Sequence, residues 1–370
     1  MGKVNIVNTD ITIIGAGPAG LAAAIESAKL GADVILIDEN ASPGGQLFKQ
    51  IHKFFGSKEH YAKTRGIDIG QALCNEAKAL GVNLMLSSVA FAIYDSKITA
   101  CTTPEGLVQV KSKCIILTLG ANENTLSFKG WVKPGVITAG AAQTIVNIYR
   151  VLPGKSVLMV GSGNVGLIVS YQLLQAGAKV AAIIEALPKI GGYGVHAAKV
   201  GRAGVPILTS HTILEAKGEK EVSSAIICKV DEKFKPIIGS EKELEVDVIC
   251  LAVGLTPQTD LARMAGCSFE YINVLGGFVP IHDKNMETTV KGIYVAGDTT
   301  GVEEASTAID EGRIAGIAAA SSLGLIDKIK SEGKISQVWE RLDSLRIGPF
   351  GKSRQDAKKV IIKAGENLCL

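Results

Sequence analysis

The chain has 370 residues, enough for two domains of ordinary size, and its 39 basic and 36 acidic residues give a formal net charge of +3. This near-balance gives no reason to expect nucleic acid as a partner. Hydrophobic residues make up 47% of the sequence, but no run of 18 uninterrupted apolar residues occurs, so we attribute them to buried parallel strands rather than to a transmembrane segment.

Two further features narrow the class of protein. The first ten residues lack the apolar core of a signal peptide, which favours a cytoplasmic location. The seven cysteines form no CxxC pair, and the five histidines show no ligand spacing. We therefore expect no disulfide scaffold, no intrinsic iron–sulfur cluster and no metal site.

The first predicted unit runs from Asp10 to Gln46. An apolar strand leads into the glycine turn Gly15–Gly20, a helix of small residues follows, and a second apolar strand ends on the acidic pair Asp38-Glu39. This is the order of a dinucleotide-binding βαβ unit, in which the acid binds the adenosine ribose hydroxyls.

Each glycine of this turn has a physical role. Gly15 makes the tight turn, Gly17 lets a pyrophosphate approach the backbone, and Gly20 lets the helix pack against the sheet. The N-terminus of the helix then presents free N–H groups and partial positive charge to the phosphates.

Smaller elements are predicted next. The basic, aromatic segment Leu47–Arg65 fits either a surface loop with a short helix or a wall beside a cofactor or docking surface. A helix over Ile67–Ala79 and several short strands follow, among them separate strands at Leu107–Lys111 and Cys114–Gly120. A further helix is predicted over Ala139–Tyr149.

The whole pattern is repeated within Ser156–Gly192, where a strand, the turn Gly161–Gly166, a helix and a second strand end on Glu185. Gly15 precedes Glu39 by 24 positions, and the same spacing separates the first glycine of the repeat from Glu185. This count aligns Glu39 with Glu185, whereas the register from the end of the first helix favours Asp38. We prefer Asp38 for the ribose and keep Glu39 beside it.

A third motif follows, in which the strand Gly292–Asp298 ends in Gly-Asp and a long helix of small residues begins near Glu303 or Glu304. The tail looks helical, with a break at Ile347–Gly351. Its basic segment Lys352–Lys363 fits a solvated helix or, alternatively, a partner-docking surface.

The predicted fold class is α/β, with two Rossmann-like dinucleotide-binding domains, each with a parallel sheet and a small β-meander. Residues 1–121 and 258–330 are predicted to form one discontinuous domain, into which residues 122–257 insert as the second. Residues 331–370 are predicted to form a C-terminal helical tail, a candidate for partner docking.

Together the three motifs resemble the two-dinucleotide-domain flavoproteins of the thioredoxin reductase type, over residues 9 to about 322. In that family the first unit and the Gly-Asp strand hold FAD, and the inserted unit holds NAD(P)H. The resemblance implies that Asp298 bonds the flavin ribitol. It also implies that the N–H groups of Ala305 and Ser306 face the flavin N1–C2=O edge, where a helix N-terminus favours the negative charge of reduced flavin.

With this resemblance, the residues expected to contact FAD are Gly15, Gly17, Pro18, Ala19, Gly20, Asp38, Glu39, Gly45, Gln46, Leu47, Val89, Thr118, Gly120, Gly297, Asp298, Ala305 and Ser306. The residues expected to contact NAD are Gly161, Gly163, Asn164, Val165, Gly166, Glu185 and Gly254. No side chain is expected to be catalytic, because hydride transfer needs no acid–base pair or nucleophile. Glu185 would repel a 2′-phosphate, so NAD(H) is expected rather than NADP.

Thioredoxin reductases need a CxxC, and its absence here excludes that activity. The segments Leu119–Trp131 and Pro134–Gln143 look instead like the FAD-carrying subunit of multi-subunit amine dehydrogenases. That group includes heterotetrameric sarcosine oxidase, dye-linked L-proline dehydrogenase, opine oxidase and hydrogen cyanide synthase. Many members add a cysteine-rich [2Fe-2S] region near the C-terminus, where this chain has only Cys369, so any cluster must belong to another chain.

The resemblance implies an FAD-dependent oxidoreductase that serves as the electron-transfer subunit of a hetero-oligomeric dehydrogenase in amino-acid catabolism. A partner flavoprotein subunit would oxidise sarcosine, proline, hydroxyproline or an opine-like substrate, and an iron–sulfur chain is a further candidate partner. Two alternatives stay open: a stand-alone NADH-dependent reductase of ferredoxin, quinone or dye, and a nucleotide-binding scaffold subunit. The second unit is also compatible with ADP, ATP or no nucleotide.

Overall fold

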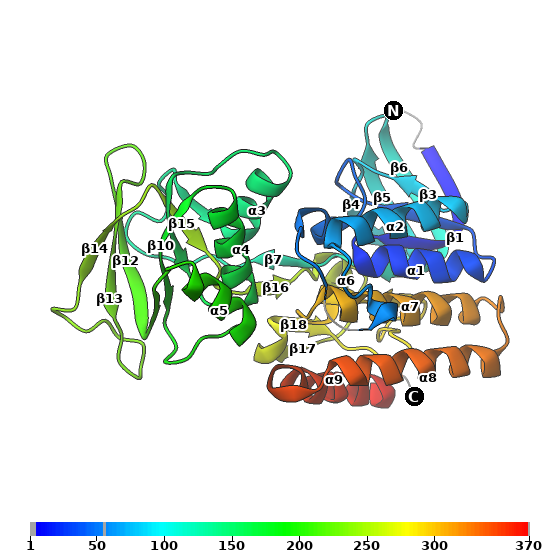
Figure 1. Ribbon diagram of the computed structural model, residues 1–370. Coiled ribbons are helices and arrows are strands. Elements are labelled where there is room, and N and C mark those ends of the chain that lie inside the picture. Colours follow the sequence, from blue (N-terminus) through cyan, green and yellow to red (C-terminus); the bar gives the residue numbers. More distant parts are fainter. Residues whose placement is uncertain (1–4, 55–56, 369–370) are drawn as a thin grey trace. The chain divides into compact units, whose positions relative to one another are not determined.

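The computed structural model describes residues 5–54 and 57–368 (Figure 1). Within these ranges the chain divides into two compact units: one contains the residues up to Asn122 and from Thr256 onward, and the other spans Glu123–Leu255. The strands β7 (Ala121–Glu123) and β16 (Leu255–Pro257) pair with each other where the chain passes between the units. Each unit combines helices with a parallel sheet, which confirms the predicted fold class.

The larger unit is built on a seven-stranded sheet in the order β3-β2-β1-β6-β5-β4, with β19 beside β6. Strands β1, β2, β3, β6 and β19 pair in parallel, whereas β4, β5 and β6 form an antiparallel meander. Their bounds are β1 Asn5–Ile14, β2 Val34–Ile37, β3 Asn83–Met85, β4 Val89–Tyr94, β5 Ile98–Thr103, β6 Gly106–Leu117 and β19 Ile293–Val295.

Strand β6 corrects the prediction of two separate strands in this region. Its first half pairs with β5 and is only partly buried, whereas Cys114–Leu117 is buried between β1 and β19. Because this strand passes from the meander into the core, its sequence changes midway from alternating polar and apolar residues to a continuous apolar run. That change made one strand look like two in the sequence.

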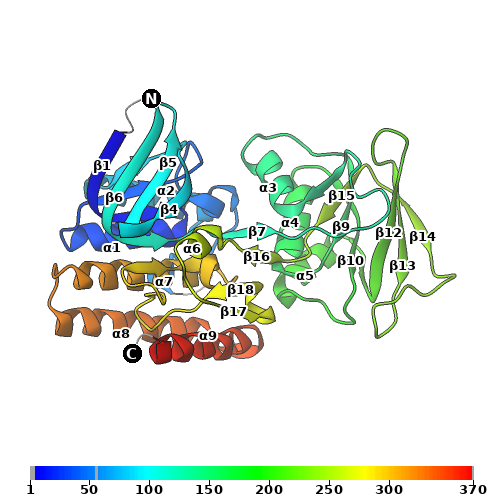
Figure 2. The same ribbon diagram turned by 180° about the vertical axis from the view of Figure 1, so that it is seen from behind.

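Helices cover one face of this sheet. Helices α1 (Pro18–Lys29) and α2 (Gly66–Ala79) pack against it, and α7 (Ala305–Ser322) packs along α1. Figures 1 and 2 show α7 between α1 and the helices α8 (Lys328–Leu345) and α9 (Gly348–Leu368). The long helix α7 is therefore buried on several sides, which accounts for its small and apolar residues.

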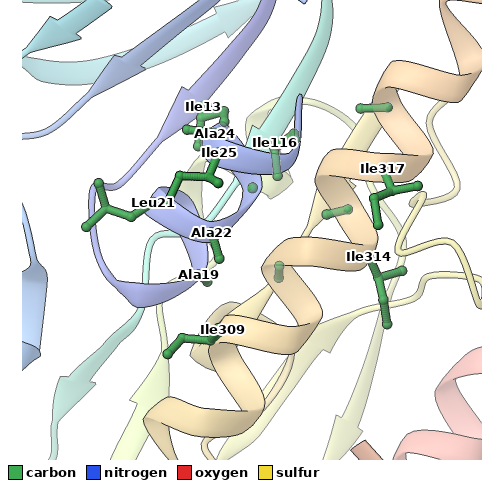
Figure 3. Packing of buried hydrophobic residues seen from close by; sticks show 14 of the residues in the cluster. Ile13, Ala19, Leu21, Ala22, Ala24, Ile25, Ile116, Ile309, Ile314 and Ile317 are labelled. Carbon is green, nitrogen blue, oxygen red and sulfur yellow. The ribbon is translucent and has the colours of Figure 1, made fainter. Parts of the chain in front are cut away.

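The contact between α1 and α7 is unusually close (Figure 3). A Cβ atom built on Gly312 would overlap the carbonyl oxygen of Ala19, and one built on Gly316 would overlap that of Ala23. Glycine at these two positions lets the helix backbones approach, and Ile309 points toward α1, whereas Ile314 and Ile317 point from the opposite side of α7.

The tail differs from the prediction in two ways. Helix α9 begins at Gly348, so most of the predicted break Ile347–Gly351 is helical. The predicted solvated helix over Lys352–Lys363 has one buried face, where Ala357 and Ile361 pack on Leu275 and Val279. The basic residues that suggested full solvation lie mostly on the rest of the helix.

Three smaller elements also belong to the larger unit. They are α6 (Asp260–Met264) and the hairpin strands β17 (Phe269–Ile272) and β18 (Gly277–Pro280). Ile361 of α9 packs against this hairpin, which therefore anchors the tail.

The smaller unit has a five-stranded parallel sheet in the order β11-β10-β9-β15-β8 and a three-stranded antiparallel sheet, β12-β13-β14. The strands are β8 Val136–Thr138, β9 Ser156–Val160, β10 Lys179–Glu185, β11 Ile207–Thr209, β12 His211–Lys217, β13 Ser224–Lys229, β14 Lys242–Glu245 and β15 Val248–Leu251. The helices are α3 Ala139–Asn147, α4 Asn164–Gln175 and α5 Gly194–Arg202.

Candidate functional site

The first glycine turn joins β1 to α1 at the carboxyl end of the parallel strands, where ligands bind in such sheets. Gly15 has a φ of +102°, and its N–H donates to the carbonyl oxygen of Ile37 at 2.8 Å. A side chain on Gly15 would overlap the backbone of Thr118. The Thr118 hydroxyl lies 2.9 Å from the carbonyl oxygen of Ile14 and 2.7 Å from that of Gly15, so it holds the turn from the neighbouring strand.

The acid at the end of β2 is fixed against this turn. Asp38 is buried, and its Oδ2 accepts the N–H of Ala16 at 2.6 Å. Its Oδ1 accepts the backbone N–H and side-chain Nδ2–H of Asn40 at 2.8 and 2.9 Å. Glu39 is exposed. Asp38 is therefore the member of the acidic pair whose carboxylate lies beside the glycine turn.

The N-terminus of α1 has the shape and polarity that a pyrophosphate requires. Gly17 is the N-cap and no side chain caps the helix there, while Pro18 occupies the first turn. A Cβ atom built on Gly17 meets nothing within 4 Å. Gly45, with a φ of +53°, packs from the other side, where a Cβ would lie 2.8 Å from the Gly17 Cα. Free helix N–H groups beside open space fit the phosphates of FAD.

The second glycine turn repeats this construction between β9 and α4. Gly161 has a φ of +106°, and a side chain there would overlap the carbonyl oxygen of Ala252. Gly163 is an uncapped N-cap with nothing within 4 Å of a built Cβ. Glu185 Oε2 accepts the Ser162 N–H at 3.0 Å and the Ser162 hydroxyl at 2.7 Å. This arrangement fits a second dinucleotide by the same physical argument.

The two turns correct the alignment of Glu39 with Glu185. Gly161 donates its N–H to Ile184, as Gly15 donates to Ile37, so the residue after each isoleucine is the equivalent acid. The smaller unit has one extra residue because β10 bulges between Val180 and Ala182. Counting along the sequence included this bulge, and the resulting alignment was wrong by one position.

The loop after Glu185 folds back onto the second turn. Gly191 donates its N–H to Ser162 Oγ at 3.0 Å, and Tyr193 donates its N–H to Asn164 Oδ1 at 2.8 Å. The Asn164 side chain, expected at the NAD site, therefore also holds this loop. Val165 is 41% exposed on α4, and Gly166 packs its helix close to Gly161.

The Gly-Asp strand reaches the first turn. Gly297 has a φ of +70°, and a Cβ there would lie 2.9 Å from the Cβ of Ala19. Gly120 donates its N–H to Thr299 Oγ1 at 3.2 Å, which joins the end of β6 to the same loop. The structure thus brings together the first turn, the end of β6 and Asp298, which the sequence places far apart.

Asp298 is a partly buried acid at the start of this loop. Its Oδ1 accepts the N–H of Glu303 at 3.2 Å, and burial raises the pKa of Asp298 to about 6. Helix α7 follows with Ala305 and Ser306 in its first turn, and no side chain caps its N-terminus. A desolvated carboxylate beside an uncapped helix N-terminus fits a ligand that brings hydroxyl groups and negative charge.

The remaining expected residues lie as follows. Gln46 and Leu47 belong to a short 3-10 helix, Gly45–Lys49, in which Leu47 is buried. Val89 begins β4 next to Ser88, whose N–H donates to the carbonyl oxygen of Asp38 at 2.9 Å. Gly254 has a φ of +107° and accepts the N–H of Asn124 at its carbonyl oxygen. Gly20 packs α1 against Gly15 and Thr118.

Sequence reasoning missed one residue of this region, Glu311 in α7. It is buried, and its Oε2 accepts the N–H of Gly297 at 3.0 Å. Burial acts to raise the pKa of Glu311, but Lys358 and Arg346 override it and hold that pKa well below its usual range. An Asp-Glu pair inside an otherwise small and apolar helix was the available signal.

No helix within residues 5–54 and 57–368 is both long enough and apolar enough to cross a membrane. Cys369, the one tail cysteine considered for a cluster, lies outside the described residues.

Comparison with known proteins is consistent with this geometry. Residues 9–312 match the family model described as pyridine nucleotide-disulphide oxidoreductase. The chain is 29% identical over 342 residues to one of the subunits of opine oxidase from Agrobacterium tumefaciens (strain Ach5), which covers 88% of this chain and 68% of that protein. It is 27% identical over 330 residues to the alpha subunit of sarcosine oxidase from Corynebacterium sp. (strain P-1), covering 86% of this chain but only 33% of that protein. Its fold resembles thioredoxin reductase from T. acidophilum, with a TM-score of 0.71, 22% identity and coverage of 85% of this chain and 99% of that chain.

Proposed function

The chain belongs to the pyridine nucleotide-disulphide oxidoreductase family, and from this membership we propose that it is the electron-transfer subunit of an amine or amino-acid dehydrogenase complex. The family implies binding of FAD and a pyridine nucleotide, and the chain is an FAD-dependent oxidoreductase of this type. The finer role, the partners and the substrate are parts of the proposal.

One observation carries the proposal: the chain has two complete glycine turns with their acids but no CxxC. FAD, when bound, supplies the two-electron chemistry. Without a cysteine pair the electrons need another outlet, and a second redox centre on a partner chain provides one. The relatives named above belong to opine oxidase and sarcosine oxidase as subunits, which supports such an assembly.

Five residues of the FAD site have proposed tasks. Asp38 binds the adenosine ribose, and the α1 N-terminus at Gly17 binds the pyrophosphate. Asp298 accepts a hydrogen bond from a ribitol hydroxyl. The N–H groups of Ala305 and Ser306 orient the flavin and favour negative charge on its reduced form.

In the smaller unit, Glu185 binds the ribose hydroxyls of NAD(H) and disfavours NADP. The proposed substrate-oxidising partner is a flavoprotein that acts on sarcosine, proline, hydroxyproline or an opine-like compound, and an iron–sulfur chain is a second proposed partner. The complete second turn favours one alternative, a stand-alone NADH-dependent reductase of ferredoxin, quinone or dye.

Mild affinity purification from the native host, followed by identification of co-purifying chains and cofactors, tests the proposal. Recovery of a partner flavoprotein, with flavin reduction only when substrate and partner are present, supports it. Anaerobic bleaching of the flavin by NADH in the isolated chain, with dye reduction that needs no partner, would favour the stand-alone reductase. A chain that takes up no FAD on reconstitution would be a nucleotide-binding scaffold, and both enzyme functions would fail.

A further inference from the structure

A buried acidic side chain of α7 holds the loop that follows β19 by hydrogen bonds. This loop, Gly297–Glu304, carries Asp298 and leads into the N-terminus of α7. Glu311, nearly two turns into α7, accepts the Gly297 N–H at its Oε2, and Thr300 Oγ1 lies 2.8 Å from the same oxygen. Thr300 Oγ1 also lies 2.9 Å from the carbonyl oxygen of Gly297. Glu311 thus fixes the loop at two points.

The cations that neutralise Glu311 come from the C-terminal tail. Lys358 of α9 is 2% exposed, and its Nζ lies 2.8 Å from Glu311 Oε1 and hydrogen-bonds to Thr300 Oγ1. Arg346, just after α8, contacts Glu311 Oε1 at 2.6 Å and Glu303 Oε2 at 2.7 Å. Thr300 and Glu303 of the loop and Glu311 of α7 therefore meet side chains of the tail, and Arg354 of α9 also donates to the carbonyl oxygen of Val302 at 3.1 Å.

Docking of α9 does not by itself require a buried lysine. Ala357 and Ile361 already pack on the apolar hairpin region. Burying an ammonium group carries a large desolvation penalty, and an apolar residue of similar size would dock the helix without that penalty. Lys358 is well placed only when Glu311 and Thr300 are also in place, so its burial and the conformation of the loop depend on each other.

We propose that Lys358 is a positioning residue of the FAD site, and that docking of α9 and binding of FAD are thermodynamically linked. This inference rests on the proposed placement of FAD against Asp298, Ala305 and Ser306. Lys358 acts through Thr300 and Glu311 and does not itself touch the cofactor. Linkage is reciprocal, so FAD stabilises the docked helix as much as the docked helix favours FAD.

Two matched pairs of variants test the proposal in the full chain. Lys358→Met is compared with Lys359→Met, whose lysine is exposed on the same helix. Thr300→Val removes the hydroxyl that joins Lys358 to the loop but leaves the Lys358–Glu311 ion pair, whereas Thr300→Ser keeps the hydroxyl. The readouts are the FAD dissociation constant, the midpoint potential of bound flavin, and hydrogen exchange of α9 with and without FAD.

We expect Lys358→Met and Thr300→Val to weaken FAD binding at least tenfold and to shift the flavin potential to more negative values, because the α7 N-terminus is less well placed. Lys359→Met and Thr300→Ser should remain within twofold of the unsubstituted protein. FAD should slow hydrogen exchange in α9 of the unsubstituted chain. If Lys358→Met does not fold, the comparison of Thr300→Val with Thr300→Ser tests the proposal on its own.

Unchanged FAD affinity and potential in Thr300→Val, or lower thermal stability of Lys358→Met with no change in either quantity, would overturn the inference and leave a purely structural ion pair. That result is distinct from failure of the proposed function, in which the unsubstituted chain would bind no FAD. FAD binding without any protection of α9 would likewise overturn the linkage.

Discussion

Asp38 and Glu185 occupy equivalent positions in the two units, each directly after the isoleucine that accepts the N–H of the first glycine. The Asp38 carboxylate accepts the Ala16 N–H at 2.6 Å, and the Glu185 carboxylate accepts the Ser162 N–H at 3.0 Å. Each acid therefore holds its glycine turn by a hydrogen bond, and its carboxylate is the group that we propose for the ribose of the dinucleotide.

Replacing Asp38 should affect FAD far more than replacing its neighbour. We expect Asp38→Ala to weaken FAD binding at least about tenfold, because a charge-assisted hydrogen bond contributes about 1.5–3 kcal/mol. Glu39→Ala, at the exposed position, should change it less than about twofold. Fluorescence titration of apoprotein with FAD measures both, and the reverse order would show that Glu39 is the ribose ligand.

Glu185 should decide the choice of pyridine nucleotide. Glu185→Gln removes the negative charge that opposes a 2′-phosphate, so the ratio of the NADPH and NADH dissociation constants should fall by roughly tenfold. Glu232→Gln, on an exposed loop of the same unit, is the control and should leave the ratio unchanged. An unchanged ratio in Glu185→Gln would mean that this carboxylate does not face the ribose.

The α1–α7 contact should tolerate no added methyl group. Gly312→Ala places a Cβ against the Ala19 carbonyl oxygen and should lower the free energy of unfolding by about 1–3 kcal/mol. Gly333→Ala is the control, because Gly333 is exposed within α8 and an added Cβ would meet no neighbouring atom. This substitution should raise the free energy of unfolding by about 0.5–1 kcal/mol. Denaturant unfolding of the apoprotein distinguishes the two, and equal effects would refute the close packing.

We expect the Asp298 carboxylate to lower the stability of the folded apoprotein in a pH-dependent way, although it contributes to FAD binding. Burial raises the pKa of Asp298 from 3.8 to about 6, so the carboxylate destabilises the folded apoprotein increasingly as the pH rises from about 4 to 6, and fully above that range. Asp298→Asn should therefore stabilise the apoprotein by about 1–2 kcal/mol near pH 8 and by almost nothing below about pH 4.

The same variant should weaken FAD binding at least about tenfold, because an amide is a weaker acceptor than a carboxylate. Thermal melts across pH and FAD titration at about pH 8 measure the two effects. Asp356→Asn, exposed on α9, should change neither. A stability gain that does not depend on pH would assign it to something other than the Asp298 carboxylate.

The parts of the fold and site that depend on local pattern were predictable from sequence. The glycine turns at Gly15 and Gly161, the apolar strands and the Gly-Asp strand each carry their signal within a few residues. The one-residue error at Glu39 arose because a bulge in β10 leaves no mark in the spacing of apolar residues.

The burial of Lys358 could not be read from sequence for a different reason. Its partner Glu311 is 47 positions away, and the residues around it are basic and polar, as on a solvated helix. Long-range pairing of a lysine with an acid depends on how α8 and α9 return along α7, which no local periodicity encodes.

The pairing of Glu311 with Lys358 also sets an order of events during protein synthesis. Glu123–Leu255 is one uninterrupted stretch and can fold as soon as it leaves the ribosome. The other unit is discontinuous, and its Lys358–Glu311 contact joins residues 47 positions apart, so this contact forms only after Lys358 has been translated. We therefore expect a nascent chain to carry its second glycine turn folded while the first is incomplete, so that FAD reaches its full affinity only after α9 has been made.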